Sequence, residues 1–263
     1  MYTKRNLIKD LEKLQINRKG TLLVHSSMKS IGPVEGGADT VLDALMEYMK
    51  EGLLVFPTHT WWTVTPENPY YYVDRSPSCV GILTELFRKR PGVVRSRHPT
   101  HSVAAIGKGA EHFVAGDEKY NSPCARGSAW GKLLDHKATI LLIGVDHTKN
   151  TFIHGVEEWA NIPGRLTETQ EDFFTVLPDG TEIRVPTRLF VGDVSKHFWK
   201  VDAILEKYEA VYKGTFGDAT VRVCDAERMA EILFQLLKIA PDLFSQNEPI
   251  LQEVLEKFKE SDH

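Results

Sequence analysis

Apolar positions recur along the chain at two spacings, and the alternation between them predicts the first part of the fold. Residues 6–16 carry apolar side chains spaced as on one face of a helix. The apolar run 21–27 is typical of a buried strand, 38–50 returns to helical spacing, and 52–58 is again strand-like. Strand, glycine-rich loop, helix and strand in this order favour a parallel βαβ unit.

The rest of the chain continues the same mixture. Residues 168–191 alternate in strand fashion around the turn PDG, which indicates an antiparallel ribbon. No internal repeat or long linker forces a boundary, so a single domain over 1–263 is expected. We expect an α/β fold with a mixed, largely parallel central sheet, flanking helices and a small antiparallel extension. The other expected elements are helices at 80–90, 127–135, 228–241 and 249–260 and strands at 102–107 and 138–145.

Composition narrows the class of protein. The chain has 263 residues, 42% of them hydrophobic, with 32 basic and 36 acidic side chains and a formal net charge of -4. Its basic residues are scattered, so the charge pattern argues against a nucleic-acid partner. The first residues lack an apolar signal-peptide core and no apolar run is long enough to span a membrane, so a cytoplasmic location without membrane attachment is expected. The three cysteines lack paired spacing and are interpreted as reduced thiols.

The stretch HSSMKSIGPVEGG, residues 25–37, is the first candidate for chemistry. It joins the strand at 21–27 to the helix at 38–50 and contains two serines, Lys29 and a pair of glycines. Free amides at a helix start, backbone that can approach closely and one positive charge suit a phosphate. The stretch matches neither GxGxxG nor a P-loop, so an ordinary strand-to-helix loop is the alternative.

A second candidate is RSRHPTHSVAAIG, residues 95–107. Two arginines there suit an anion, since guanidinium groups pair with phosphate, and a basic turn leading into a strand is the plain alternative. His98 and His101 are spaced for a metal. Carboxylates and thiols are missing from their sequence neighbourhood, which disfavours a metal site.

The third candidate is TFIHGVEEWANIP, residues 151–163. A helix that begins near Thr151 places His154 and Glu157 at positions i and i+3, where the carboxylate reaches one ring nitrogen and the other nitrogen faces a substrate. Glu158 is the alternative partner, and an ordinary surface helix is the alternative structure.

These stretches occur together in one order. The segments VHSSMKSIGPVEGGADTVLDAL, RSRHPTHSVAAIG and LLIGVDHTKNTFIHGVEEWANIP, with the isolated Ser122 and Pro123, closely resemble the aminoglycoside 3-N-acetyltransferase family. The resemblance extends from about Leu7 to the C-terminal helices. It implies transfer of an acetyl group from acetyl-CoA to an amine, and an α/β fold unlike that of the common acetyltransferases.

The resemblance also assigns roles to single residues. The family pattern T-x-x-H-x-x-E falls on Thr151, His154 and Glu157, which implies that these three are catalytic and that His154 acts as the base. No metal is implied. Coenzyme A contacts are implied at Ser26, Ser27, Lys29, Gly36, Gly37, Arg97, Ser102 and Val103.

The acceptor side is less determined. An aminoglycoside is a polycation, so carboxylates are expected around it, and Asp74 and Glu158, with His197, are the predicted substrate contacts. Residues 59–77, dense in aromatics, are expected to form a wall or lid. Further acidic candidates are Glu168, Asp172, Asp193 and Asp202, while Lys196, His197 and Lys200 bring positive charge that disfavours a polycation.

Alternative functions therefore stay open. One is acetyl transfer to a different amine, and another is acyl-CoA binding with little turnover. A third is a metal-dependent hydrolase built on His98, His101, His154 and Glu157. The expected partners are coenzyme A and a small-molecule amine, and the chain is expected to be a monomer or a homodimer.

Overall fold

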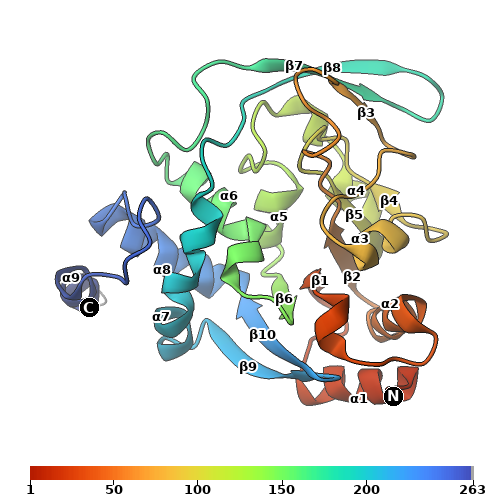
Figure 1. The fold of residues 1–263 in the computed structure, drawn as a ribbon, viewed down its shortest axis with the longest axis horizontal. Coiled ribbons are helices and arrows are strands. Elements are labelled where there is room, and N and C mark those ends of the chain that lie inside the picture. Colours follow the sequence, from red (N-terminus) through yellow and green to blue (C-terminus); the bar gives the residue numbers. More distant parts are fainter. Residues whose placement is uncertain (262–263) are drawn as a thin grey trace.

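A seven-stranded mixed sheet forms the centre of the protein (Figure 1). The structure is a computed structural model and describes residues 1–261. In spatial order the strands are β4 (Val94–Arg95), β5 (Val103–Gly107), β2 (Leu53–Pro57), β1 (Thr21–Ser26), β6 (Thr139–Ile143), β10 (Ala219–Asp225) and β9 (Val211–Phe216).

The three central strands are parallel, and the outer pairs on both sides are antiparallel. β1 pairs in parallel with β2 and with β6, whereas β5 and β10 run against their central neighbours. The central strands are almost entirely buried, which matches their near-continuous apolar sequences. The predicted α/β class, with parallel strands at the sheet centre, is confirmed.

A small second sheet contains the predicted ribbon. β7 (Glu171–Val176) and β8 (Glu182–Thr187) pair antiparallel across the turn that contains PDG, and β3 (Tyr70–Tyr72) adds to β7 in parallel. Figure 1 shows this hairpin at the top of the molecule, at the opposite end from α1 (Lys4–Lys13).

Helices cover both faces of the central sheet. Leu22 and Val24 of β1 belong to one apolar cluster and Leu23 to the other, because neighbouring side chains of a strand point to opposite faces. The first face is covered by α1, α2 (Gly37–Tyr48) and α3 (Ile82–Phe87). The second is covered by α4 (Ala110–Val114), α5 (Ala129–Asp135), α6 (Thr151–Trp159) and α8 (Ala226–Ile239), and α9 (Gln252–Ser261) packs on α8.

Some elements were not anticipated from the sequence. The edge hairpin β9–β10 and α7 (Asp202–Lys207) lie in a segment for which no element was predicted. Short 3-10 helices occur at η1 (Met28–Ile31), η2 (Asp117–Lys119), η3 (His147–Lys149) and η4 (Val194–Val201). Within residues 1–261, no helix combines the length and the apolar character needed to cross a membrane.

Candidate active site

A cavity of about 490 Å³ lies against the start of α6. Its walls come from four separated segments, 59–66, 100–101, 148–154 and 189–195, together with Val80 and Phe173. We call it the acceptor cavity. Its volume is in the usual range for small-molecule sites, roughly 300–1,000 Å³.

A second cavity, of about 310 Å³, adjoins it on the side of β1. It includes His25 and Ser26 at the carboxyl end of β1, and we call it the strand-end cavity. Both cavities are lined by the same five residues, so they meet there: His59, Trp61, Val80, Lys149 and Thr151.

Capping side chains fix the start of α6. The side chain of Asn150 accepts a hydrogen bond from the backbone N–H of Phe152 at 3.3 Å, and Asp146 caps η3 through the N–H of Thr148 at 2.9 Å. Asn150 and Thr151 are almost completely buried. Thr151 therefore has a fixed place at the junction of the two cavities.

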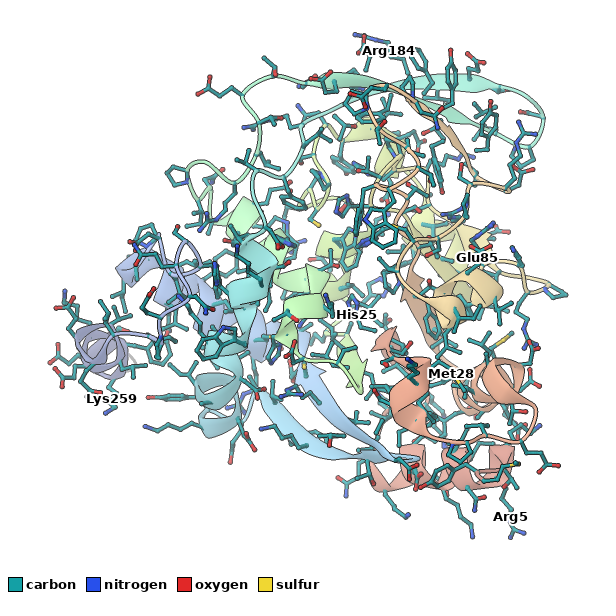
Figure 2. The ribbon with its side chains drawn as sticks, viewed as in Figure 1. Arg5, His25, Met28, Glu85, Arg184 and Lys259 are labelled. Carbon is teal, nitrogen blue, oxygen red and sulfur yellow. The ribbon has the colours of Figure 1, made fainter. Side chains whose placement is uncertain are left out.

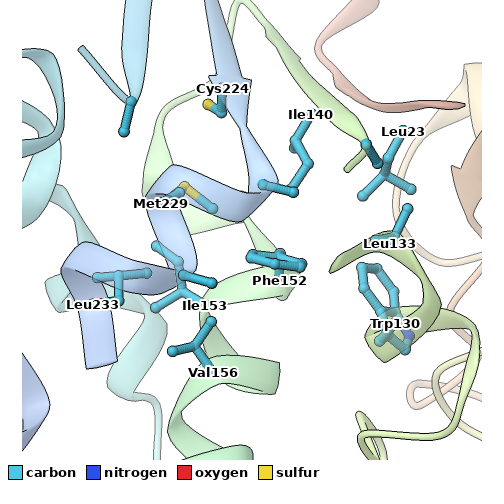
Figure 3. Packing of buried hydrophobic residues seen from close by; sticks show 14 of the residues in the cluster. Leu23, Trp130, Leu133, Ile140, Phe152, Ile153, Val156, Cys224, Met229 and Leu233 are labelled. Carbon is cyan, nitrogen blue, oxygen red and sulfur yellow. The ribbon is translucent and has the colours of Figure 1, made fainter. Parts of the chain in front are cut away.

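Packing holds the same helix from behind. Figure 3 shows Phe152, Ile153 and Val156 of α6 near Met229 and Leu233 of α8, and all five belong to one buried apolar cluster. A tilt of α6 would break this apolar contact, so the position of the polar face of the helix is set by the core.

His154, Glu157 and Arg165 form a line of charged and polar groups that leads away from the acceptor cavity. Nδ1 of His154 lies 3.4 Å from Oε2 of Glu157, and Oε1 of the same carboxylate accepts a 2.6 Å hydrogen bond from Nε of Arg165. Glu157 is 1% exposed and the His154 side chain is 16% exposed. The carboxylate thus has a buried cation on one side and the imidazole on the other.

Aromatic rings hold the His154 imidazole in place. Its ring stacks on Phe190 with the centroids 4.5 Å apart, and Phe198 meets it edge-on at 4.7 Å. With Nδ1 buried beside Glu157, Nε2 is the ring nitrogen that can serve the acceptor cavity, which His154 lines.

Glu158, a predicted substrate contact, does not line the acceptor cavity. Its carboxylate accepts hydrogen bonds from the Ser122 hydroxyl and, at 3.1 Å, from the backbone N–H of Cys124. It lines a separate cavity of about 550 Å³ with Arg165 and Arg188. Burial raises the pKa of Glu158.

Four further imidazoles gather near the two cavities: His25, His59, His98 and His101. The ring centroids of His59 and His101 lie 4.6 Å apart, and those of His25 and Trp130, in a stacked arrangement, lie 6.4 Å apart. Burial lowers the pKa of His25 to about 3, and Figure 2 shows this residue near the centre of the molecule. Burial also holds the pKa values of His59 and His101 well below the usual value. These rings are therefore neutral at pH 7.

His98 lies deeper than the cavity surface. Its Nδ1 accepts the backbone N–H of His101 at 3.1 Å, and burial lowers its pKa to about 3. Within residues 1–261, no three His, Cys, Asp or Glu side chains come together as a metal-binding set. The metal-hydrolase hypothesis thus gains no support from the arrangement of these histidines.

The predicted coenzyme A loop between β1 and α2 is open and glycine-rich. Ser26 lines the strand-end cavity, Ser27 accepts a 3.0 Å hydrogen bond from the hydroxyl of Ser30, and Lys29 is exposed on η1. Gly36 and Gly37 enter α2 with φ of 74° and 63°, in the left-handed region that favours glycine. The start of α2 has no side-chain cap.

The other predicted coenzyme contacts lie apart from both cavities. Arg97 is exposed, and its guanidinium lies 3.5 Å from the carboxylate of Glu118. Ser102 is completely buried, where its hydroxyl donates to the carbonyl of Thr58 at 2.8 Å and accepts from Arg95. Val103 is also completely buried, in β5. Neither Ser102 nor Val103 has a side chain at the cavity surface.

Most of the predicted acceptor contacts lie elsewhere too. Asp74 is exposed and outside both cavities, and its carbonyl accepts a hydrogen bond from Arg88. His197 is buried, and its Nδ1 lies 3.1 Å from the side-chain oxygen of Asn247. Lys200 donates to the carbonyl of Leu243. The side chains of His197 and Lys200 therefore contact the C-terminal region.

Of the aromatic side chains in the predicted wall or lid, Trp61 lines the acceptor cavity, Trp62 lines the strand-end cavity and Tyr71 is buried. Lys149 and Phe190 were not predicted as site residues, and His59 was included only as the first residue of the predicted wall or lid. His59 comes shortly after the end of β2, a buried strand next to β1, so its position was a signal that could have been used. No sequence feature marked Phe190 as a site residue, because only tertiary packing brings it to His154.

Comparison with known proteins identifies the family of the chain that forms this site. Residues 23–238 match the model described as aminoglycoside 3-N-acetyltransferase. The chain belongs to the aminoglycoside 3-N-acetyltransferase family. This confirms the resemblance inferred from the sequence, and the protein is accordingly an acyltransferase of that family.

Curated members of the aminoglycoside 3-N-acetyltransferase family match over much of the chain. Aminoglycoside N(3)-acetyltransferase IV of Salmonella sp is 32% identical over 227 residues, which cover 84% of this chain and 82% of the relative. The SPbeta prophage-derived aminoglycoside N(3')-acetyltransferase-like protein YokD of Bacillus subtilis (strain 168) is 32% identical over 176 residues. That match spans 59% of this chain and 64% of the length of YokD.

Solved structures of the same family share the fold. The apoenzyme of aminoglycoside acetyltransferase AAC(3)-IVa has a TM-score of 0.77 at 26% identity, covering 92% of this chain and 91% of that one. A mutant of that enzyme in complex with a gentamicin has a TM-score of 0.79, again at 26% identity, with the same coverage of both chains. AAC-IIIb, solved with CoASH, has a TM-score of 0.80 at 24% identity, covering 90% of this chain and 96% of that one.

Proposed function

We propose that the protein is an acetyl-CoA-dependent N-acetyltransferase that acts on a primary amine. The observation that carries the proposal is the position of His154. Its imidazole lines the acceptor cavity, is held between two aromatic rings and has Glu157 beside its buried nitrogen. Membership of the aminoglycoside 3-N-acetyltransferase family supports acetyl transfer as the reaction.

His154 is proposed as the general base. An alkyl amine is mostly protonated at pH 7, so a proton must leave before its lone pair can attack the thioester carbonyl. Nε2 of His154 takes this proton. Glu157 stabilises the imidazolium that results, and Arg165 holds the Glu157 carboxylate in place.

Thr151 is proposed to assist at the carbonyl oxygen. Attack of the nitrogen forms a C–N bond and a tetrahedral oxyanion, to which the Thr151 hydroxyl can donate a hydrogen bond from the junction of the two cavities. Collapse of the intermediate breaks the C–S bond. His154 passes the first proton to solvent, then removes the second proton from the attacking nitrogen and delivers it to the leaving thiolate. His154 is then neutral again, one proton is released overall and no covalent enzyme intermediate is needed.

The coenzyme is proposed to enter on the β1 side. Its thioester would reach Thr151 through the strand-end cavity, past Ser26, while the loop at Ser27 and Lys29 and the glycine entry to α2 would receive its phosphates. Ser102 and Val103 are buried, so we propose that they support the site from within the core. Arg97 lies outside both cavities, so we propose no direct role for it.

The test is thiol release from acetyl-CoA with a panel of amines, with coenzyme A affinity measured separately by calorimetry. The panel begins with gentamicin and apramycin, because solved relatives were obtained with these aminoglycosides. Replacement of His154 by Ala should lower kcat/KM by roughly 10²–10⁴-fold, the usual contribution of a general base. Coenzyme A affinity should stay within about twofold of the wild-type value, because a general base acts on the amine and adds little to ground-state coenzyme binding.

Two outcomes would contradict this proposal. Wild-type turnover in His154→Ala would remove His154 as the base. Coenzyme A binding without acetylation of any amine would favour the acyl-CoA-binding alternative. A matched control is His112→Ala, which removes an exposed histidine remote from both cavities and should leave turnover unchanged.

A further inference from the structure

The acceptor cavity has almost no charge on its walls. Among the residues that line it, Asp193 is the one carboxylate and Lys149 the one permanent cation, so their formal charges cancel. Both are exposed. His59 and His101, which also line the cavity, are uncharged because their burial disfavours the imidazolium and lowers their pKa values. A substrate with several positive charges would find one counter-charge there.

Two of the other acidic candidates, Asp172 and Asp202, already have partners. Asp172 pairs with Arg184 at 2.7 Å, and Asp202 pairs with Arg222 at 2.7 Å. Neither residue lines the acceptor cavity. Glu157, the buried carboxylate beside His154, is paired with Arg165. These groups are therefore not placed to compensate an ammonium group of a bound substrate.

Apolar and aromatic side chains make up a large part of the cavity wall. They come from several elements: Trp61, Val64, Phe173, Leu189 and Phe190. Val64 and Phe173 are buried in a small apolar cluster against which Leu189 packs, so this part of the wall is held by the second sheet. Such a surface suits a hydrophobic or aromatic body.

The wall also limits what an ammonium group gains on binding. Moving a charged group from water to an uncharged cavity costs free energy unless a partner is present, and each additional ammonium repeats that cost. Pockets that bind cations supply complementary charge for this reason. One ammonium can be accommodated, because it loses its proton to His154, and because Trp61 lines the cavity as an aromatic ring of the kind that attracts cations.

We propose that the acceptor is an amine with a single positive charge, carried on an aromatic or apolar body, and that polycationic aminoglycosides are poor substrates. The inference rests on the proposed acetyl transfer and concerns the acceptor alone. It distinguishes this chain from its relative AAC(3)-IVa, a mutant of which was solved with a gentamicin and with apramycin.

A matched pair of amines tests the charge dependence. 2-Phenylethylamine and 1,4-bis(2-aminoethyl)benzene share a ring and a reacting amine, and the second compound carries one additional ammonium. We expect kcat/KM for the monoamine to exceed that for the diamine at least tenfold, and gentamicin and apramycin to be slower still. If gentamicin or the diamine were acetylated as efficiently as the monoamine, the inference would be overturned. The acetyltransferase proposal would stay intact.

A charge-changing variant sharpens the test. Ser195 lines the cavity, and its hydroxyl donates to Asp193 at 3.3 Å. Ser195→Asp adds a second carboxylate, and Ser195→Asn is its uncharged match. The diamine-to-monoamine ratio of kcat/KM should rise at least threefold in Ser195→Asp relative to Ser195→Asn.

The remaining outcomes are also decisive. Equal ratios in the two Ser195 variants would show that wall charge does not set the preference, against the inference. If no amine led to thiol release, in protein that calorimetry shows to bind coenzyme A, the proposed function itself would be contradicted. The two failures are therefore distinguishable by whether any amine is acetylated.

Discussion

The two loops that follow the neighbouring parallel strands β1 and β6 have the same topology and opposite character. Each strand leads into a short 3-10 helix and then an α-helix, as β1, η1 and α2 in one case and β6, η3 and α6 in the other. The first loop is glycine-rich, and α2 begins without a side-chain cap. The second is capped twice by side chains, and two of its polar residues, His147 and Asn150, are buried.

This difference suits the two proposed tasks. A diffuse anion such as a coenzyme phosphate needs backbone amides and room, which an uncapped glycine entry provides. Proton transfer needs one nitrogen held within a few tenths of an ångström, which requires caps, aromatic contacts and a packed helix. Adjacent positions on one sheet thus support an open loop, proposed for binding, and a rigid loop, proposed for catalysis.

Removing Arg165 should have the largest effect. Arg165→Met leaves the buried carboxylate of Glu157 without its cation, and breaking such a pair costs about 3–5 kcal/mol of unfolding free energy. Chemical denaturation measures the loss. Arg126→Met, which breaks an exposed ion pair with Asp135, is the matched control and should cost less than about 1 kcal/mol.

The double variant Glu157→Gln with Arg165→Met separates charge from packing. It removes both members of the pair and should recover part of the lost stability, but its activity should stay low because His154 lacks its carboxylate. If Arg165→Met alone were as stable as the wild type, the ion pair between Glu157 and Arg165 would not be what stabilises the region around α6.

The second effect is pH dependence from His147, which belongs to the capped loop. Burial lowers the pKa of His147 to about 4, so the unfolded chain binds a proton more readily between pH 4 and pH 6.5. Its contribution to stability is present above pH 6.5 and is lost as the pH falls toward 4. Between about pH 7 and about pH 5 this loss amounts to about 2 kcal/mol.

Unfolding free energies of the wild type and His147→Gln at the two pH values provide the measurement. The variant should lose less stability on acidification, whereas His112→Gln, which changes an exposed histidine, should follow the wild type. Identical pH slopes for the wild type and His147→Gln would rule out His147 as the titrating group.

Glycine replacement tests the open loop at smaller cost. Gly36→Ala and Gly37→Ala both place a side chain on left-handed backbone, which costs about 1–2 kcal/mol. A Cβ at Gly36 would also lie 2.5 Å from the Thr40 hydroxyl oxygen, while nothing lies within 4 Å of one at Gly37. Gly36→Ala should therefore be the less stable variant. The KM for acetyl-CoA should rise in both, and an unchanged KM in both would count against a coenzyme site at this helix start.

The smallest effect is expected from Lys29→Ala. An exposed cation that meets a phosphate in water contributes about 0.2–1 kcal/mol, so the Kd for coenzyme A should rise a few-fold and the effect should shrink with added salt. Calorimetry at two salt concentrations measures it, with Lys50→Ala, which changes an exposed lysine just after α2, as the control. Equal Kd values for the Lys29 and Lys50 variants would place the phosphates elsewhere.

Much of the fold could be predicted from the sequence, because the spacing of apolar residues along the chain indicated most of its helices and strands. The central strands, most of the helices beside them and the hairpin at the PDG turn were predicted, whereas α4, β3 and β4 were not. The strands of the hairpin β9–β10 were missed. They lack a continuous apolar run and include polar residues such as Thr220 and Arg222.

For the site, the sequence by itself determined the local geometry: the i, i+3 spacing of His154 and Glu157 and the position of Thr151 at the start of their helix. Tertiary structure alone decided what surrounds them. It brought Arg165 to Glu157 and Phe190 to His154, placed Glu158 in another cavity and buried Ser102. Spacing along a helix is fixed by backbone geometry, whereas contacts between distant segments depend on how the sheet orders its strands and how the core packs. The charge of the acceptor cavity is a property of that second kind.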